Sequence, residues 1–330
     1  MAIKVLLLGA GGNAGMNFAK CLNMAGGYEI TGADVSANNL AAVGHMYPRT
    51  ELLPTDLAEK LVALKPLIDE HDFVHAQPDA EVGFLLKHVV SKKIFNHDLE
   101  HWRYFRDKIR VQRDLKQLKT SYLAQTTTSE FKDMMVDGRV WVRAIKGAGS
   151  RAALPVGTLE QAKNWMRYWC EFKGYTSRDF MLCEYLPGRE YAVQLLFNKG
   201  ELVHAQARER VEYFFNNVMP SGQSSTPSVA CIVNDEQDVY DTAVKACGPL
   251  PHGIYGVDIK RNSDEVPVAT EVNYGRFYTT SDFFAAHGVN TPHAYVQLAV
   301  NKGMWIPSIA TAQPGTWYRG LDREPTSIKA

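Results

Sequence analysis

The stretch GAGGNAGMNFA, residues 9–19, directly follows the largely apolar run Ile3–Leu8. This order predicts a strand, a glycine turn and the start of a helix, which is how a dinucleotide-binding fold begins. The glycines and Ala14 fit the spacing G-x-G-x-x-G/A, and Asp34 follows about 20 residues later, where an acid would hold a ribose hydroxyl. The stretch leaves two interpretations open: a nicotinamide site, or the same fold put to another use.

Composition narrows the class of protein. The chain has 330 residues, enough for about two or three packed domains. Its 36 basic and 36 acidic residues cancel, which argues against a global attraction to nucleic acid or anionic lipid. We find no apolar run long enough for a membrane span and no cleavable signal, so we expect a cytoplasmic protein without a membrane segment. The cysteines form no zinc or redox motif, which favours reduced thiols: Cys21, Cys170, Cys183, Cys231 and Cys247.

The first ninety or so residues alternate between short apolar runs and amphipathic stretches. This alternation predicts a parallel sheet with helices on both faces. Beyond the first strand and helix, the expected strands are 28–34 and 72–76, and the expected helices are 57–68 and 81–90. Residues 102–119 also have a helical pattern, rich in Arg and Lys.

The pattern then changes to strands and turns. We expect strands at 140–143, 180–185, 190–197 and 202–208, and a helix that starts at the capping box Thr158-Leu159-Glu160-Gln161. Residues 212–228 predict a long loop, and a helix follows from residue 234. Two strands at 253–261 and 266–273 form a predicted hairpin. The last thirty residues are expected to be a mostly irregular tail.

The predicted hairpin carries the strongest chemical signal. Asp258 lies on one strand, and Glu271 and Asn273 lie on the other, where the period of two points both to one face. Carboxylate and amide oxygens are hard ligands that suit magnesium, which completes its shell with water and phosphate. A solvated sheet face would show the same alternation, so the spacing alone leaves both interpretations open.

Two further segments have the composition of a nucleotide site. Residues 143–151 form a glycine-containing loop whose backbone N–H groups could cover a polyphosphate, while Arg143, Lys146 or Arg151 neutralises its charge. Residues 184–190 form an extended segment broken by Pro-Gly, which could meet a planar base, and Glu190 could bind ribose hydroxyls. A plain β-turn and an acidic strand end would look similar.

In this order, the segments resemble the ATP-grasp superfamily, particularly one synthetase unit of the carbamoyl-phosphate synthetase large subunit, and also biotin carboxylase. The resemblance covers roughly residues 1–300. It implies an α/β chain with a Rossmann-like pre-ATP-grasp domain at 1–95, an ATP-grasp domain at 96–302 with a small lid at about 120–186, and a tail at 303–330.

The resemblance also implies roles for individual residues. Lys108, in the Asp107-Lys108 pair, would reach an ATP phosphate together with Arg143, Lys146 and the loop glycine Gly149. The implied adenine hinge is Glu184, Tyr185 and Leu186, with Glu190 on the ribose. Asp258, Glu271 and Asn273 match the ligands of Mg-ATP, with Mn²⁺ as an alternative metal. Arg276, Arg143 and Arg151 would be the catalytic cations.

Two positions depart from the superfamily pattern. In Glu271-Val272-Asn273-Tyr274-Gly275-Arg276 the arginine comes one residue later than in the E-x-N-x-R signature. Pro220 stands where the carbamoyl-phosphate family has a histidine. These departures leave ATP binding as the expectation and put the family's specific substrates in doubt.

The resemblance implies an ATP-dependent carboxylate–amine ligase that acts through an acyl phosphate, with a small carboxylate and an amine or ammonia as substrates. It suggests a homodimer. The N-terminal glycines then serve the second substrate or the architecture, and the helix beginning near Asn13 offers an anion site. The alternatives are a bicarbonate-using carboxylase or carbamoyl-phosphate-type synthetase, an NAD(P)-linked oxidoreductase, and a non-catalytic nucleotide sensor.

Overall fold

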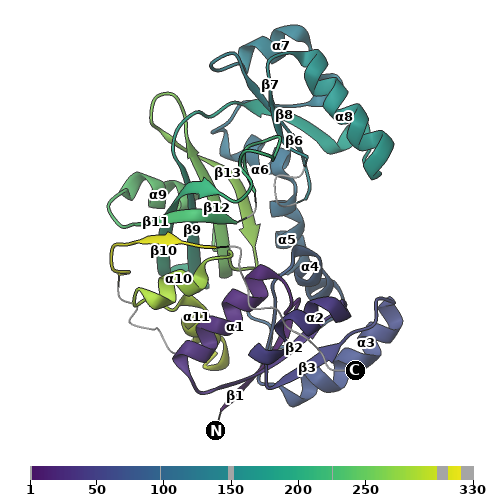
Figure 1. Cartoon of the computed structure of the whole chain (residues 1–330), viewed down its shortest axis with the longest axis vertical. Helices are drawn as coiled ribbons and strands as arrows, with labels where there is room; N and C mark the ends of the chain where they lie inside the picture. Colours follow the sequence, from purple (N-terminus) through teal and green to yellow (C-terminus); the bar gives the residue numbers. More distant parts are fainter. Residues whose placement is uncertain (1, 97, 148–151, 225, 303–310, 321–330) are drawn as a thin grey trace.

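The N-terminal part of the chain forms a parallel sheet with helices on its faces (Figure 1). The computed structural model describes residues 2–96, 98–147, 152–224, 226–302 and 311–320. The sheet has the order β3-β2-β1-β4, and β1 pairs in parallel with both β2 and β4. Its elements are β1 (Ile3–Leu8), α1 (Asn13–Ala25), β2 (Tyr28–Asp34), α2 (Ala37–Val43), β3 (Arg49–Leu52), α3 (Leu57–Glu70), β4 (Phe73–Ala76) and α4 (Asp79–His88).

The glycine turn between β1 and α1 is shaped by close packing. Gly9 has a φ of +70°, and a Cβ atom there would lie 2.1 Å from Cδ of Pro78. A Cβ on Gly15 would lie 2.6 Å from the Gly9 carbonyl oxygen. Asp34 is buried, and its two carboxylate oxygens accept the N–H groups of Gly11 and Ser36, both at 3.0 Å. The acid that could hold a ribose therefore holds the turn.

Replacing Gly9 by Ala is expected to lower the free energy of unfolding by about 2 kcal/mol or more, because the new Cβ meets Pro78 in a backbone conformation that alanine disfavours. Gly44→Ala is the matched control: its backbone is helical and a Cβ there meets nothing within 4 Å. That control should be neutral or stabilising by up to ~1 kcal/mol. Chemical denaturation measures both variants, and equal stabilities would contradict the packing account.

The segment with the predicted helical pattern, residues 102–119, is helical through residue 115 and is divided between two helices. α5 (Leu99–Arg106) ends at Asp107, which leaves helical geometry with φ −93° and ψ 89°, and α6 (Lys108–Leu115) begins on the next residue. The Asp107 side chain accepts the N–H of Arg110 at 3.1 Å and so caps α6. The break places Lys108 in the first turn of a new helix.

A small antiparallel sheet and two helices, seen at the top of Figure 1, lie within the segment predicted to be the lid, and we keep that name for them. Its strand order is β5-β8-β6-β7. The predicted capping box is present, because Thr158 and Gln161 bond each other's backbone N–H groups at the start of α8. The lid elements are β5 (Thr120–Tyr122), α7 (Thr128–Asp133), β6 (Val140–Ala144), β7 (Leu154–Val156), α8 (Leu159–Lys173) and β8 (Phe180–Glu184). Single 3-10 turns occur at Gly44–Met46, Leu123–Gln125 and Ser177–Asp179.

The large sheet is antiparallel, in the order β13-β12-β9-β10-β11-β14. Its strands are β9 (Glu190–Asn198), β10 (Glu201–Tyr213), β11 (Pro227–Val233), β12 (Gly253–Arg261), β13 (Pro267–Tyr274) and β14 (Thr316–Tyr318). The predicted hairpin is β12 and β13. One expectation was wrong: the strand predicted to end at residue 208 runs on through Tyr213, into the start of the predicted loop. The short strand β14 lies within the tail, which was predicted to be mostly irregular, and it pairs with β11. Residues 303–310 and 321–330 of that tail lie outside the described residues.

The remaining helices cover the large sheet; they are α9 (Gln237–Ala246), α10 (Ser281–Ala286) and α11 (Thr291–Val300). Helix α9 packs on β9, β12 and β13, whereas α10 and α11 lie against α1 of the N-terminal part. In one apolar cluster, Tyr295 and Leu298 of α11 join Val5 and Phe73 of the N-terminal sheet. No helix among the described residues is long and apolar enough to cross a membrane. The division of the chain at residues 95 and 302 stays a prediction.

Candidate active site

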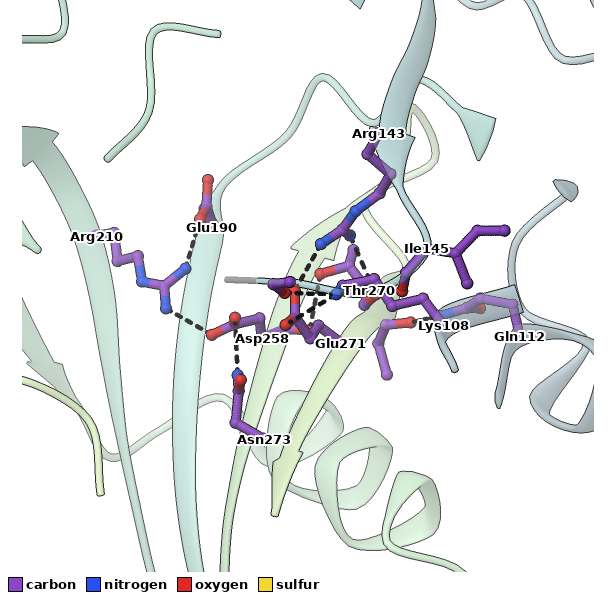
Figure 2. Close-up of polar contacts among 12 residues, drawn as sticks. Lys108, Gln112, Arg143, Ile145, Glu190, Arg210, Asp258, Thr270, Glu271 and Asn273 are labelled. Atoms are coloured by element: carbon purple, nitrogen blue, oxygen red, sulfur yellow. Dashed lines mark hydrogen bonds and ion pairs between the residues drawn. The ribbon is translucent and has the colours of Figure 1, made fainter. Parts of the chain in front are cut away.

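The hairpin of β12 and β13 places three oxygen-bearing side chains together (Figure 2). Asp258 is the register partner of Glu271, and a register shift follows directly after Asp258. The Asn273 amide donates to Oδ2 of Asp258 at 3.2 Å. The structure thus brings together all three side chains that the sequence proposes as metal ligands.

Two cations reach Glu271 from other elements. Nζ of Lys108, on α6, lies 3.4 Å from Oε1 of Glu271, and a guanidinium nitrogen of Arg143, on β6, lies 2.5 Å from Oε2. Lys108 also donates to the carbonyl oxygen of Gly147 at 2.9 Å. Burial raises the pKa of Glu271, but Lys108, Arg143 and Arg276 outweigh it and lower that pKa to about 2. Glu271 is therefore a carboxylate at neutral pH.

Arg210, on β10, is a site residue that the sequence analysis missed. Its guanidinium pairs with Glu190 at 2.7 Å and with Asp258 at 2.5 Å (Figure 2). Glu190 also accepts the Tyr213 hydroxyl and, at 2.7 Å, the Gln223 amide. Burial raises the pKa of Asp258 although Arg210 opposes the shift, and the nearby Glu271 and Glu190 carboxylates add to it. The Asp258 carboxyl group therefore lies close to two other carboxylates, those of Glu271 and Glu190.

A cavity of about 660 Å³ opens between the lid and the large sheet; we call it the hinge cavity. The predicted hinge residues line it, and apolar side chains form much of its wall. Its charged end carries Glu190, Arg210, Asp258 and Glu271. The residues that line the hinge cavity include Leu118, Trp141, Arg143, Cys183, Glu184, Tyr185, Leu186, Glu190, Arg210, Asp258 and Glu271.

A second cavity, of about 800 Å³, lies on the side of the acids nearer the N-terminal sheet; we call it the inner cavity. Asp258, Glu271 and Asn273 line it, and Ala14 of α1 forms part of the opposite wall. Glu271 also lines a smaller cavity of about 320 Å³, which contains Lys108. The acids of the hairpin therefore stand where the hinge and inner cavities approach each other.

The other predicted residues fare differently. Arg276 lines the inner cavity and donates to Oδ1 of Asn273. Lys146 is exposed and does not line these cavities. Gly149 and Arg151 lie outside the described residues.

The donor set fits a magnesium-bound nucleotide. Asp258, Glu271 and Asn273 supply oxygens on one cavity wall, and Asp258 shares its buried surroundings with two other carboxylates, which a divalent cation would neutralise. Among the described residues no group of three or more acids, histidines or cysteines is placed to hold a metal ion. A cation at the hairpin would therefore complete its shell with phosphate and water oxygens, as magnesium commonly does.

The whole chain is similar to solved ATP-grasp structures. No protein-family model matches the sequence, and no curated protein matches it. A carboxyaminoimidazole ribonucleotide synthase from Aspergillus clavatus, complexed with ATP, superimposes with a TM-score of 0.72 at 16% identity, covering 96% of this chain and 81% of that one. Biotin carboxylase from Campylobacter jejuni gives 0.70 at 15% identity, with 95% and 74% coverage. An L-amino acid ligase from Bacillus licheniformis gives 0.69 at 13% identity, with 96% and 79% coverage.

These similarities define the class of fold. The chain has the ATP-grasp fold, as the resemblance implied. More particularly, its N-terminal parallel sheet, lid and large sheet together match the fold of the carboxylase, carboxyaminoimidazole synthase and amino acid ligase structures. Identities of 13–16% over nearly the whole chain carry the fold and no individual substrate.

Proposed function

We propose that this protein is an ATP-dependent carboxylate–amine ligase, which activates a small carboxylate as an acyl phosphate and forms an amide with an amine or ammonia. One observation carries the proposal: a cavity with apolar side chains at the predicted hinge leads to largely buried acids and cations at its far end, in an ATP-grasp fold. That sequence of surfaces suits, in order, a base, a ribose and a metal-bound triphosphate.

In this proposal the nucleotide lies in the hinge cavity. Adenine packs on Leu118, Trp141 and Leu186, and the backbone of 184–186 meets its edge. Glu190 binds the ribose hydroxyls. Asp258, Glu271 and Asn273 would hold Mg²⁺, which neutralises phosphate charge when it is bound.

The cations divide the work at the phosphates. Lys108 and Arg143, which Glu271 already orients, bind the phosphate oxygens. Such fixed cations stabilise the negative charge that spreads over the phosphoryl group during its transfer. Arg276 orients the substrate carboxylate from the inner cavity. Lys146, Gly149 and Arg151 belong to the proposed phosphate-covering loop.

The chemistry then has two steps. A carboxylate oxygen attacks the γ-phosphorus and ADP leaves, which gives the acyl phosphate. The amine nitrogen attacks the acyl carbon, phosphate leaves, and the nitrogen loses a proton to give the amide. The site has to exclude water during these steps, because an exposed acyl phosphate hydrolyses unproductively.

Calorimetric titration with ADP tests the nucleotide site directly. We expect ADP to bind only when Mg²⁺ is present, and NADH and NADPH not to bind. An ADP-release screen over amino acids and small carboxylates, with ammonia as the amine, then tests turnover. Binding of NADH without a response to ADP would overturn the ligase in favour of an oxidoreductase. Binding of MgADP without release for any acid would favour a nucleotide sensor.

A bicarbonate-using enzyme is the second candidate. It is favoured by the similarity to biotin carboxylase and to a carboxyaminoimidazole ribonucleotide synthase, since both names describe carboxylation chemistry. ADP release that requires bicarbonate and no other acid would select it. We further propose a homodimer, which sedimentation tests; a related 2-oxoglutarate carboxylase domain is described as a dimer.

A further inference from the structure

Arg208, on β10, is a buried arginine to which the proposed reaction gives no task. Its side chain is 1% exposed, its guanidinium carbon lies 4.6 Å from the centre of the Tyr278 ring, and it donates to the Thr280 hydroxyl. Within the described part of the chain, no carboxylate forms an ion pair with it, and its Nε has no hydrogen-bond partner. A buried cation is costly unless something supplies the opposite charge.

Two other largely buried arginines of the large sheet, Arg210 and Arg261, have carboxylate partners that offset this cost. Arg210 pairs with Glu190 and Asp258, and Arg261 pairs with Glu236 and Asp238. Arg208 has a hydroxyl and an aromatic ring instead. Burial, and then the neighbouring Arg210, lowers the pKa of Arg208 to about 10, which still leaves it charged at neutral pH.

The position of Arg208 relates it to the reacting centre. Arg208 and Arg210 lie two residues apart on one strand, so they share a face at a spacing of about 7 Å. Both line the inner cavity with Asp258. Arg210 reaches the acids of the hairpin, whereas Arg208 reaches Thr280, at the start of α10. An anion bound to Arg208 would therefore lie beside the proposed site of carboxylate activation, two residues along β10 from Arg210.

The opposite wall of the inner cavity does not repel an anion. Ala14, in the first turn of α1, lines it, and that turn has no side-chain cap and no acidic residue. The positive end of the helix dipole is at this end of α1.

We propose that the inner cavity takes a substrate with two anionic oxygen groups: the carboxylate that is activated beside Asp258 and Glu271, and a second group, carboxylate or phosphate, that rests on Arg208. The inference builds on the proposed ligase function and narrows its acid substrate. Acidic amino acids, short dicarboxylates and phosphorylated amino acids are the classes it selects, and Arg208 determines that specificity.

The test is a binding panel of charged acids and matched neutral partners, titrated by calorimetry into the full-length protein with MgADP. The charged members are glutamate, aspartate, succinate, glutarate and O-phosphoserine. The matched partners keep the first carboxylate but have an uncharged second group: glutamine, asparagine, succinamate, glutaramate and serine. We expect at least one charged member to bind about tenfold or more tightly than its partner, because the second group gains charged hydrogen bonds. Whether the carboxylates or the phosphate bind identifies the second group.

Three variants locate the effect. Arg208→Met should remove the preference while MgADP still binds, Arg208→Lys should retain part of it, and the exposed Arg49→Met should leave it unchanged. No preference in the unchanged protein, or a preference that survives in Arg208→Met with MgADP binding intact, would overturn the inference. If Arg208→Met loses MgADP binding, the Arg208→Lys result decides in its place.

The same panel separates this inference from the ligase function. A charged acid that binds through Arg208 but releases no ADP supports the anion site and contradicts the ligase. ADP release with neutral and charged partners at equal KM supports the ligase and overturns the role of Arg208. In the active case, Arg208→Met should raise the KM for the acid about tenfold while the KM for ATP is unchanged.

Discussion

Replacing Glu271 by Gln is expected to lower the rate of acid-dependent ADP release by about 10²–10³-fold and to abolish the Mg²⁺-dependent binding of ADP. Glu271 is the carboxylate that holds both Lys108 and Arg143, and it is a proposed metal ligand. The neutral amide keeps the size of the side chain but removes the charge on which all three functions depend. Steady-state ADP release and calorimetry with and without Mg²⁺ measure the two effects.

Two further variants separate chemistry from folding. Glu271→Asp keeps the charge on a shorter arm and should recover part of the Mg²⁺-dependent binding. Glu201→Gln removes an exposed carboxylate at the start of β10 and should behave as the unchanged protein. A Glu271→Gln protein that melts normally and retains full ADP release would remove Glu271, and with it the hairpin, from the proposed site.

Replacing Arg210 by Met should lower the free energy of unfolding by about 3–5 kcal/mol, which is the usual cost of leaving buried charges without their partner. Without Arg210, both Glu190 and Asp258 lose their ion pair with this guanidinium. Arg189→Met is the control, because Arg189 is half exposed and its pair with Glu236 should contribute at most ~1 kcal/mol. Denaturant unfolding at neutral pH compares the two variants.

The pH dependence of the Arg210→Met defect gives a second check. Burial already raises the pKa of Asp258 above its ordinary value, and removing Arg210 takes away the cation that opposes this shift. A raised folded pKa means that Asp258 favours the folded state when protonated, so the defect should shrink as the pH falls through that pKa and grow as it rises. A defect independent of pH would show that lost packing, and not charge, explains it.

The sequence predicted the parts of this fold that carry a strong local pattern. β2 and β12 have the predicted bounds because apolar runs ended by polar turns mark both. β3 was missed because it is a short edge strand with mostly exposed side chains, Arg49 among them. β14 was missed because three residues show no period, and its pairing with β11 comes from distant chain.

The site divides in the same way. The acids of the hairpin were found because one strand pair brings them together, and Lys108 was found through the resemblance. Arg208 and Arg210 were missed: Arg208 ends the strand predicted at 202–208, and Arg210 lies beyond it, in the part of β10 that the sequence did not predict. A period of two says that they share a face but not which cavity that face lines. Their partners come from β9, β12 and the segment that leads into α10, and a single sequence does not show that these segments lie next to β10.

The apolar contact between α11 and the N-terminal sheet bears on how the chain folds as it is synthesised. Val5 and Phe73 leave the ribosome long before Tyr295 and Leu298, which pack against them. Until then that face of the first sheet is covered only in part, by α1, and contacts of such long sequence separation slow folding. The nascent N-terminal part therefore exposes apolar surface until α11 is made, and we expect chaperones to bind at that face.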